Sequence, residues 1–229
     1  MLAILSSMPF ESDLVLSCME GVRRKTLAGK TVCRGNLSGH EVLLMNTGIG
    51  KVNAAHSATC ILEAYRVRKI MNIGVGGAYP EAGLEVGDVA LAVKEILGDE
   101  GVIGPQGWGS YREIGIPLVQ AGRKKYFNEF PMSVPGRKDM KMKTGSFVTV
   151  SAATGTRARA RELEERFGAV CENMEGAAIA QVCAIYKVPM IEIRGISNIA
   201  GVRDKSKWDL KLASQNCQKA VLERAAALF

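Results

Sequence analysis

Carboxylates in this chain occupy positions where a strand-like run of residues gives way to a helix-like one. Glu11 follows the first apolar run, and Glu172 and Glu175 precede a stretch of small and apolar residues at 176–184. A helix amino end keeps a buried carboxylate ionised, and an ionised carboxylate in a cleft can hold sugar hydroxyls or oppose a cation. For Glu11 the helix dipole alone would account for the residue, whereas for Glu175 a structural and a functional role fit the context equally well.

A second group of polar residues follows the next predicted strand. The β-branched run at 188–193 ends in Arg194 and in the triplet Ile196-Ser197-Asn198. In an α/β protein the carboxyl end of a strand and the amino end of a helix can face one cleft, which is where such proteins place their chemistry. We therefore expect the stretch 171–203 to form much of a functional site.

Several other chemistries lack their sequence signatures. Glycine clusters at 48–50 and 74–77 follow predicted strands, but neither has the spacing of GxGxxG, and no GxxxxGK[ST] phosphate loop occurs. The glycines still indicate turns whose free amide groups could donate to a ligand. His40 and His56 are the only histidines, and no GxSxG nucleophile motif is present. Catalysis by histidine is therefore disfavoured.

The cysteines indicate neither a metal site nor a disulfide framework. There are six of them, they form no CxxC pair, and most have apolar neighbours, as reduced core thiols do. Their positions are Cys18, Cys33, Cys60, Cys171, Cys183 and Cys217. We expect no metal and no cofactor.

Length and charge bound the class of protein. With 229 residues and 47% hydrophobic composition, and with no linker-like stretch, residues 1–229 are predicted to form a single domain. The net charge of +7 comes from scattered basic residues with little aromatic interleaving, which favours a solvated surface and anionic small substrates over nucleic acid. No charged leader precedes the apolar start, and no apolar run approaches the roughly 18 residues that span a bilayer. We expect a cytoplasmic protein that binds neither nucleic acid nor membrane.

Strand-like and helix-like stretches alternate along the chain, which implies an α/β protein with a mostly parallel or mixed sheet covered on both faces. Strands are predicted at 2–7, 31–37, 41–46, 68–73, 86–93, 147–151 and 188–193, and helices at about 8–20, 52–65, 157–167, 175–184 and 205–228. The strand at 68–73 is expected to break into the glycines that follow it. Residues 95–143 have weak periodicity and predict a loop over the active site, with Trp108 and Tyr111 set between glycines.

Five motifs give the chain a family resemblance. SSMPFE at 6–11, NTGIGKVNAA at 46–55, NIGVGGA at 72–78, ENMEGAA at 172–178 and RGISN at 194–198 resemble the nucleoside phosphorylase/nucleosidase superfamily, particularly the methylthioadenosine/adenosylhomocysteine nucleosidases. Within that group, SAATGT at 151–156 and RGISNIAGVRD look most like the futalosine hydrolases, which remove hypoxanthine from futalosine in the alternative menaquinone pathway. The resemblance implies a three-layer α/β/α domain around a mixed, barrel-like central sheet, usually as a homo-oligomer.

The resemblance also implies catalytic roles. Glu11 falls on the carboxylate that activates the attacking water, and Glu175 on the acid that grips the ribose hydroxyls. Asn198 occupies the place of the aspartate that contacts the base. The substrate-binding positions implied in the same way are Arg194 near the water-binding carboxylate, Met174 packed on the sugar, Val75, Gly76 and Gly77 in a turn that lines the ribose and water site, Gly155 and Thr156 at the purine edge, and Ser197 beside Asn198.

These side chains suit cleavage of an N-glycosidic bond without a metal or coenzyme. Positive charge builds on the ribose and negative charge on the departing purine, so the site needs an anion near the sugar and donors at the base. Asn198 has two amide hydrogens, able to meet both N7 and the 6-oxo oxygen of hypoxanthine or guanine, although its carbonyl could instead face a 6-amino group. The expected substrate is a small purine nucleoside.

Three other functions remain open from the sequence. A phosphorylase would use phosphate in place of water, but Glu11 would repel that anion. A methylthioadenosine-type nucleosidase is opposed by Asn198. A nucleoside-binding protein that has lost catalysis is opposed by the joint presence of Glu11, Glu175 and Arg194.

Overall fold

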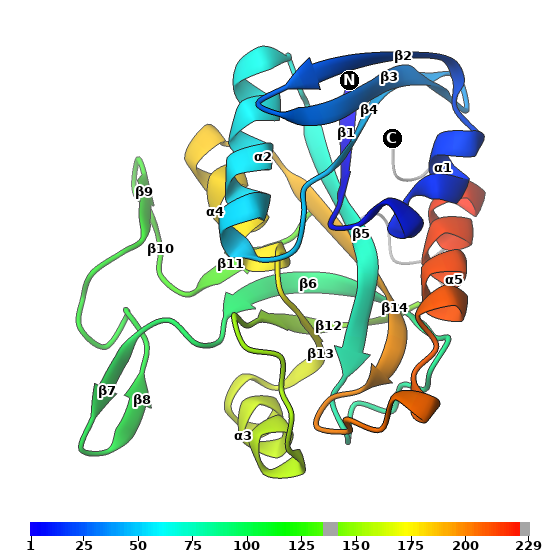
Figure 1. Ribbon diagram of the computed structural model, residues 1–229. Coiled ribbons are helices and arrows are strands. Elements are labelled where there is room, and N and C mark those ends of the chain that lie inside the picture. Colours follow the sequence, from blue (N-terminus) through cyan, green and yellow to red (C-terminus); the bar gives the residue numbers. More distant parts are fainter. Residues whose placement is uncertain (135–141, 225–229) are drawn as a thin grey trace.

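One large mixed sheet contains most of the strands in the computed structural model, which describes residues 1–134 and 142–224 (Figure 1). This sheet joins β1 (Leu2–Ser6), β2 (Glu20–Leu27), β3 (Lys30–Leu37), β4 (His40–Asn46), β5 (Lys69–Ala78), β6 (Val89–Leu97), β11 (Glu129–Pro131), β12 (Lys143–Thr149), β13 (Ala169–Asn173) and β14 (Met190–Ile199). Two separate antiparallel hairpins are formed by β7 (Val102–Gly104) with β8 (Gly107–Gly109) and by β9 (Val119–Ala121) with β10 (Lys124–Tyr126).

Part of the sheet closes on itself as a barrel. β5 pairs with β14 in parallel, β14 with β6 antiparallel, β6 with β12 and β12 with β13 in parallel, and β13 returns to β5 antiparallel. On its other side β5 pairs with β1, and β4, β3 and β2 extend the sheet from there as an open wing. β5 therefore belongs to both the barrel and the wing, and side chains that reach β5 from either part come close together.

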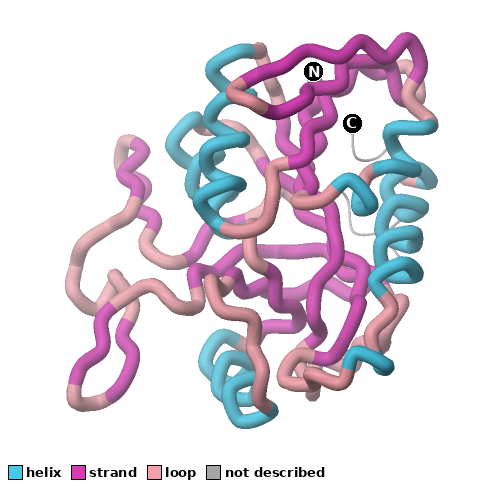
Figure 2. Tube along the Cα trace, viewed as in Figure 1, coloured by secondary structure: helices cyan, strands magenta, loops and turns pink. Residues whose placement is uncertain are grey.

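Helices cover both faces of the sheet (Figures 1 and 2). α2 (Lys51–Ala64) and α4 (Gly176–Tyr186) lie on one side, α1 (Asp13–Ser17) and α5 (Leu210–Glu223) on the other, and α3 (Arg157–Phe167) packs beside the barrel. Ala3 and Leu5 of β1 belong to the apolar core that lies between the sheet and helices α2 and α4. Leu2 and Ile4 belong to the apolar core on the other face, beneath α1 and α5. Because both faces are buried, β1 is a continuous apolar run, and the α/β class with a mixed, barrel-like sheet is confirmed.

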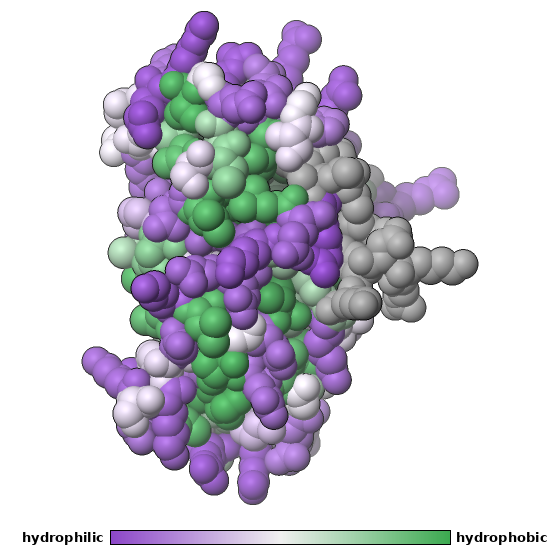
Figure 3. Space-filling model, turned by 90° about the vertical axis from the view of Figure 1, so that its right-hand side faces the viewer, coloured by the Kyte–Doolittle hydropathy of each residue, from purple (hydrophilic) through white to green (hydrophobic). Residues whose placement is uncertain are grey.

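α5 is the amphipathic helix that the end of the sequence predicts. Cys217 and Val221 are fully buried against the sheet, whereas the polar residues Lys211, Gln215 and Lys219 are exposed. Figure 3 faces this side of the molecule, where hydrophilic residues form a band between areas of apolar residues. No helix among the described residues has the length and apolar composition needed to cross a membrane.

Two strands extend further than the sequence predicts. β5 does not break at Gly74 but continues to Ala78, so Gly76 and Gly77 lie in a strand and not in a turn. β14 likewise runs through Arg194 and Asn198. The two strands pair over this whole stretch and supply each other with backbone hydrogen bonds, so glycines that suggest a break remain extended.

Other predictions were incomplete or shifted. The sequence did not predict β2, an exposed edge strand of charged residues, and the first helix is replaced by the short 3₁₀ helix η1 (Pro9–Glu11) and by α1. The strand predicted at 86–93 is β6, from Val89 to Leu97. The last helix begins at Leu210 after the 3₁₀ helix η3 (Lys205–Lys207), and its predicted end at 228 lies outside the described residues.

The segment 95–143 is not a single loop. It contains the end of β6, both hairpins, β11 and the start of β12, while residues 135–141 lie outside the described part of the chain. Trp108 packs edge-on against Phe167 of α3, with 5.5 Å between ring centroids, and the guanidinium of Arg166 lies over its ring. This tryptophan is therefore accounted for by packing against α3.

Candidate functional site

Glu11 ends the 3₁₀ helix η1 and reaches across to β5. Its Oε1 accepts a hydrogen bond from the Val75 amide at 2.9 Å, and its Oε2 accepts from the Met8 amide at 2.8 Å and from the Ser7 hydroxyl at 2.5 Å. The side chain is 1% exposed. A Cβ at Gly74 would lie 2.5 Å from Glu11 Oε1, so a glycine is needed where the carboxylate crosses the strand. Three donors thus fix the carboxylate against β5.

Glu175 stands at the amino end of α4, but its carboxylate does not cap its own helix. Asn173 Oδ1 accepts from the amides of Glu175 and Gly176 at 3.0 and 2.7 Å, and Thr149 Oγ1 accepts from the Ala177 amide at 2.7 Å. These contacts satisfy helix donors that would otherwise lack partners. The Glu175 carboxylate is therefore free to leave the helix, and its Oε1 accepts from the amide of Gly50, 125 residues earlier, at 2.8 Å.

Arg194 connects the two carboxylates through β5. Its Nη1 donates to the carbonyl oxygen of Val75 at 3.1 Å and lies 3.7 Å from Glu175 Oε2. The same Val75 donates its amide to Glu11. The arginine side chain is 1% exposed, and Glu175 is 5% exposed. The predicted site residues Glu11, Val75, Glu175 and Arg194, which come from four parts of the chain, therefore meet at one place.

Burial and charge act in opposite directions on these groups. Burial raises the pKa of the Glu175 carboxyl above its ordinary value, while Arg194 and the Gly50 amide lower it and Glu11 and Glu192 raise it further. Burial lowers the pKa of Arg194, but the carboxylates of Glu192, Glu175 and Glu11 outweigh it and raise the pKa above the ordinary value of arginine. Arg194 is therefore a permanent cation among acids.

The amide of Asn198 lies on β14, where its neighbour on β5 is Gly77. Asn198 Oδ1 accepts a hydrogen bond from the Ser197 hydroxyl at 2.8 Å, and that hydroxyl lies 3.2 Å from the Gly76 carbonyl oxygen. A Cβ at Gly77 would lie 3.1 Å from Asn198 Nδ2. With its oxygen engaged by Ser197, the half-buried side chain presents Nδ2 as a donor. The structure thus brings the predicted residues Gly76, Gly77, Ser197 and Asn198 together.

The remaining predicted residues border this arrangement. Met174 is half-buried in the link between β13 and α4. Thr156 is exposed and caps α3 by accepting from the Arg159 amide at 3.2 Å, and the exposed Gly155 lies beside Arg203. The Gly201 amide donates to the Thr154 carbonyl oxygen at 3.1 Å, which joins the segment around Gly155 to the chain that follows Asn198.

Glu172 has a structural role in place of the functional one considered for it. Its Oε1 accepts from the Thr154 amide at 2.9 Å, its Oε2 accepts from the Thr154 hydroxyl, and the Tyr79 hydroxyl donates to Oε2 at 3.4 Å. Burial raises the pKa of Tyr79 above its usual value, and the neighbouring Glu172 raises it further. Glu172 therefore ties the segment 151–156 to the barrel.

Sequence reasoning missed several supporting residues. Ser7 holds Glu11, Gly50 holds Glu175, and Asn173 with Thr149 caps α4. The glycine cluster at 48–50 did signal a free amide donor, but its partner lies far away in the sequence. Among the described residues no group of three or more His, Cys, Asp and Glu side chains is arranged to hold a metal ion.

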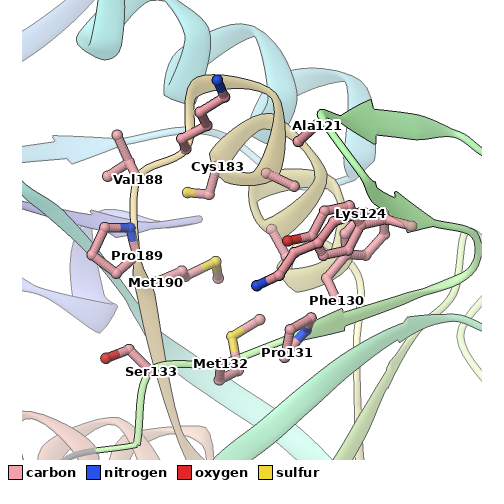
Figure 4. Close-up of a pocket in the computed structure, with 14 residues that line it drawn as sticks. Ala121, Lys124, Phe130, Pro131, Met132, Ser133, Cys183, Val188, Pro189 and Met190 are labelled. Carbon is pink, nitrogen blue, oxygen red and sulfur yellow. The ribbon is translucent and has the colours of Figure 1, made fainter.

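A cavity of about 440 Å³ lies at the other end of α4 (Figure 4). Cys183 of α4, Met190 of β14 and Met132 after β11 are among the residues that line it. None of the predicted site residues lines this cavity. It is separate from the place where the acids and Arg194 meet.

The chain is similar to known proteins in both sequence and fold. A sequence model of the phosphorylase superfamily matches residues 1–229. The futalosine hydrolase of Thermus thermophilus is 36% identical over 190 residues, which cover 81% of each chain, and a 5'-methylthioadenosine/S-adenosylhomocysteine nucleosidase of Bacillus thuringiensis is 30% identical over 91% of this chain and 90% of the relative. The corresponding nucleosidase from Neisseria meningitidis, solved with methylthio-immucillin-A, has a TM-score of 0.81 at 25% identity over 98% of this chain and 97% of that one. The Streptococcus pneumoniae nucleosidase has a TM-score of 0.83 at 24% identity over 100% and 99%.

Proposed function

Since this chain belongs to the phosphorylase superfamily, and is a nucleosidase acting on N-glycosidic bonds as its relatives are, we propose that its substrate is futalosine. The reaction would release hypoxanthine and dehypoxanthine futalosine, a step of the alternative menaquinone pathway. The relative at 36% identity supports this choice of substrate. The observation that carries it is the orientation of Asn198.

Asn198 would receive the departing base. Because Ser197 donates to its Oδ1, the amide nitrogen is the atom left to face the purine, and its two hydrogens suit N7 and a 6-oxo oxygen. A 6-amino group in the same place would meet a second donor and leave a buried amide hydrogen unpaired. Such a mismatch costs about 1–3 kcal/mol, or roughly 5- to 150-fold in discrimination. The site thus favours hypoxanthine over adenine.

Glu175 would stabilise the sugar as the bond breaks. The ribose gains positive charge, and a carboxylate held in a buried site interacts with that charge more strongly than it would in water. Glu175 is held by the Gly50 amide and lies 3.7 Å from Arg194, so one of its oxygens remains available to ribose hydroxyls. The amide contact places the carboxylate before the substrate arrives.

Glu11 would activate water. A general base within hydrogen-bond reach of the attacking water contributes roughly a hundredfold to ten-thousandfold in rate. Ser7, Met8 and Val75 all donate to this carboxylate and so point their hydrogens at it. The same donors are then unavailable to phosphate, and the acid repels that anion, which favours hydrolysis over phosphorolysis.

A second candidate activity is hydrolysis of methylthioadenosine or adenosylhomocysteine. It is favoured by the Bacillus thuringiensis relative, which matches more of this chain than the futalosine hydrolase does. The base distinguishes the two candidates, since one releases hypoxanthine and the other adenine.

Incubation with each substrate in phosphate-free buffer, followed by chromatography of the products, tests the proposal. We expect hypoxanthine from futalosine at a higher kcat/KM than adenine from methylthioadenosine. Release of adenine alone would establish the second candidate. A requirement for added phosphate would indicate a phosphorylase, and retention of one nucleoside per protein without release would indicate a binding protein.

The pH dependence of the reaction tests the role of Glu175. Its carboxylate must be ionised, and burial raises its pKa, so kcat/KM should fall as the pH drops through a value above the ordinary range of a glutamate. Arg194→Gln removes the charge that opposes this shift and should move the acid limb to higher pH. A pH profile of kcat/KM for both proteins measures this. An acid limb that stays in place in the variant would exclude Glu175 as the titrating group.

We also propose that the protein is a homo-oligomer whose contact includes the start of α2. Val52 is 84% exposed and Ile49 is 55% exposed, and they flank Gly50, which binds Glu175. Apolar side chains gathered next to a site suit a surface covered by a second copy. Light scattering should give a multiple of the 24.6 kDa chain mass, and Val52→Glu should reduce it, whereas Ser17→Glu on α1 should not. A monomer mass would contradict this proposal.

A further inference from the structure

Each strand of the barrel contributes one buried polar side chain to a cluster under the amino end of α4. The five residues are Asn72 of β5, Glu95 of β6, Thr149 of β12, Asn173 of β13 and Glu192 of β14. None is more than 5% exposed, and both glutamates are fully buried. A Cβ on Gly176, the first residue of α4, would overlap both carboxylate groups. The helix can therefore approach the two acids only because this position is a glycine.

Hydrogen bonds connect this cluster to Arg194 and to the amino end of α4, where Glu175 stands. Glu192 Oε1 accepts from Asn72 Nδ2 and from Arg194 Nε, each at 2.9 Å. Glu95 lies next to Glu192, because a Cβ on Gly176 would be 2.2 Å from Glu95 Oε1 and 2.4 Å from Glu192 Oε2. The Glu95 oxygens accept hydrogen bonds from Asn173 Nδ2 at 2.5 Å and from the Thr149 hydroxyl at 2.8 Å. Asn173 and Thr149 in turn cap α4. The cluster thus runs from Arg194 to the backbone of Glu175.

Two buried carboxyl groups in contact share a proton, because two adjacent charges cannot both remain ionised without water. Their surroundings differ. Glu192 lies beside the Arg194 guanidinium, with Oε1 2.8 Å from Nη2, whereas Glu95 receives hydrogen bonds from the neutral side chains of Thr149 and Asn173. Glu192 Oε2 finds no donor in the described part of the chain unless Glu95 carries a hydrogen. The proton therefore belongs on Glu95, and the negative charge on Glu192.

We propose that Glu95 and Glu192 form a proton-sharing pair that positions Arg194 for the glycosidic reaction. Ionised Glu192 holds the guanidinium at 2.8 Å, while Glu175 lies at 3.7 Å from it. Glu192 thereby neutralises the charge of Arg194, and the Glu175 carboxylate remains available to interact with the sugar. Glu95, as the acid, makes this possible by donating to Glu192 in place of adding a second negative charge. The inference rests on the proposed function, since it assigns Glu175 to the sugar.

Other ionisable groups near the pair agree with this placement of the proton. Burial raises the pKa of Glu95 well above its ordinary value, and Glu192 raises it further. On β13, burial raises the pKa of the Cys171 thiol, which stays neutral, and the Tyr79 hydroxyl after β5 stays neutral as well. Arg194 is thus the cation that faces the pair, and Glu175 lies beyond it.

Replacing each acid by glutamine distinguishes their roles. A glutamine at 95 can still donate to Glu192, as the protonated acid does, whereas a glutamine at 192 removes the charge that holds Arg194. We expect Glu192→Gln to lower kcat at least about tenfold more than Glu95→Gln does. The exposed variant Glu165→Gln serves as a control and should leave kcat unchanged. Equal kcat losses in Glu95→Gln and Glu192→Gln would overturn the assignment of the proton.

The pH profile supplies a readout that a purely structural role would not move. Glu192 raises the pKa of Glu175, so Glu192→Gln should shift the acid limb of kcat/KM to lower pH, as Arg194 turns to Glu175. An acid limb unchanged in this variant would overturn the positioning role.

Stability tests the proton even if no substrate is turned over. Because folding raises the pKa of Glu95, the native state binds one more proton than the unfolded state above about pH 4.3, and stability falls as the pH rises towards the folded pKa. In this range the unfolding equilibrium constant should rise about tenfold per pH unit more in the wild-type protein than in Glu95→Gln. Denaturant titrations between pH 5 and 8 measure this. Equal slopes would overturn the protonated state of Glu95, whereas inactivity of the wild-type protein on every nucleoside would reject only the proposed function.

Discussion

Glu11→Gln should lower kcat by roughly a hundredfold to ten-thousandfold while leaving KM nearly unchanged. Glutamine has the size of the acid and keeps an oxygen that can accept from Val75 or from Met8, but it cannot take a proton from water. The carboxylate sits against β5 and not at the sugar assigned to Glu175, so binding of the nucleoside should persist. Steady-state kinetics in phosphate-free buffer measure both parameters.

The matched control for this variant is Ser7→Ala. It removes one donor to Glu11 but keeps the carboxylate, so kcat should fall far less than in Glu11→Gln. Thermal unfolding of each variant shows whether the fold persists. A folded Glu11→Gln protein with wild-type kcat would show that another group activates the water.

Asn198→Asp should shift the preference of the enzyme from a 6-oxopurine to a 6-aminopurine. A carboxylate at this position accepts a hydrogen bond from a 6-amino group and, when protonated, donates to N7, whereas it repels a 6-oxo oxygen. The change replaces a matched hydrogen bond by an unmatched one, worth about 1–3 kcal/mol, so the ratio of the two kcat/KM values should change roughly 5- to 150-fold. Parallel assays with futalosine and methylthioadenosine measure this ratio.

Ser197→Ala tests the reason for that preference. Ser197 donates to Asn198 Oδ1, so its loss frees the amide to turn and should weaken the preference without reversing it. A ratio that stays constant in both variants would show that the base is recognised elsewhere in the site.

The sequence indicates which residues are candidates for the site, but not which of them contact each other. Glu11, Glu175, Arg194 and Asn198 stand in short motifs at the ends of apolar runs. In the structure Glu11 and Arg194 both bind Val75 of β5, and Glu175 lies 3.7 Å from Arg194. Contacts between segments that are distant in the chain are harder to predict from the sequence. The Gly50 amide and Glu175 are 125 residues apart, so the turn at 48–50 predicted a donor but not its partner.

The buried acid pair shows the same limit more strongly. Glu192 interrupts an apolar strand and is two residues from Arg194, so both side chains point to one side of β14, which the sequence alone would allow one to see. Glu95, however, lies in a stretch whose strand boundaries were shifted in the prediction. Its closeness to Asn173, 78 residues later, depends on closure of the barrel. Barrel closure itself came from the family resemblance and not from the periodicity of the strands.

The wing of the sheet ends in β2, the last strand in the pairing order. Within the described part of the chain its other side is unpaired and offers backbone donors and acceptors that could recruit a strand of another molecule. Arg23, Arg24 and Lys25 stand along this strand, and like charges on two such strands repel each other. The basic residues of β2 thus have a role unrelated to the substrate, since their repulsion opposes edge-to-edge pairing of this strand between two molecules.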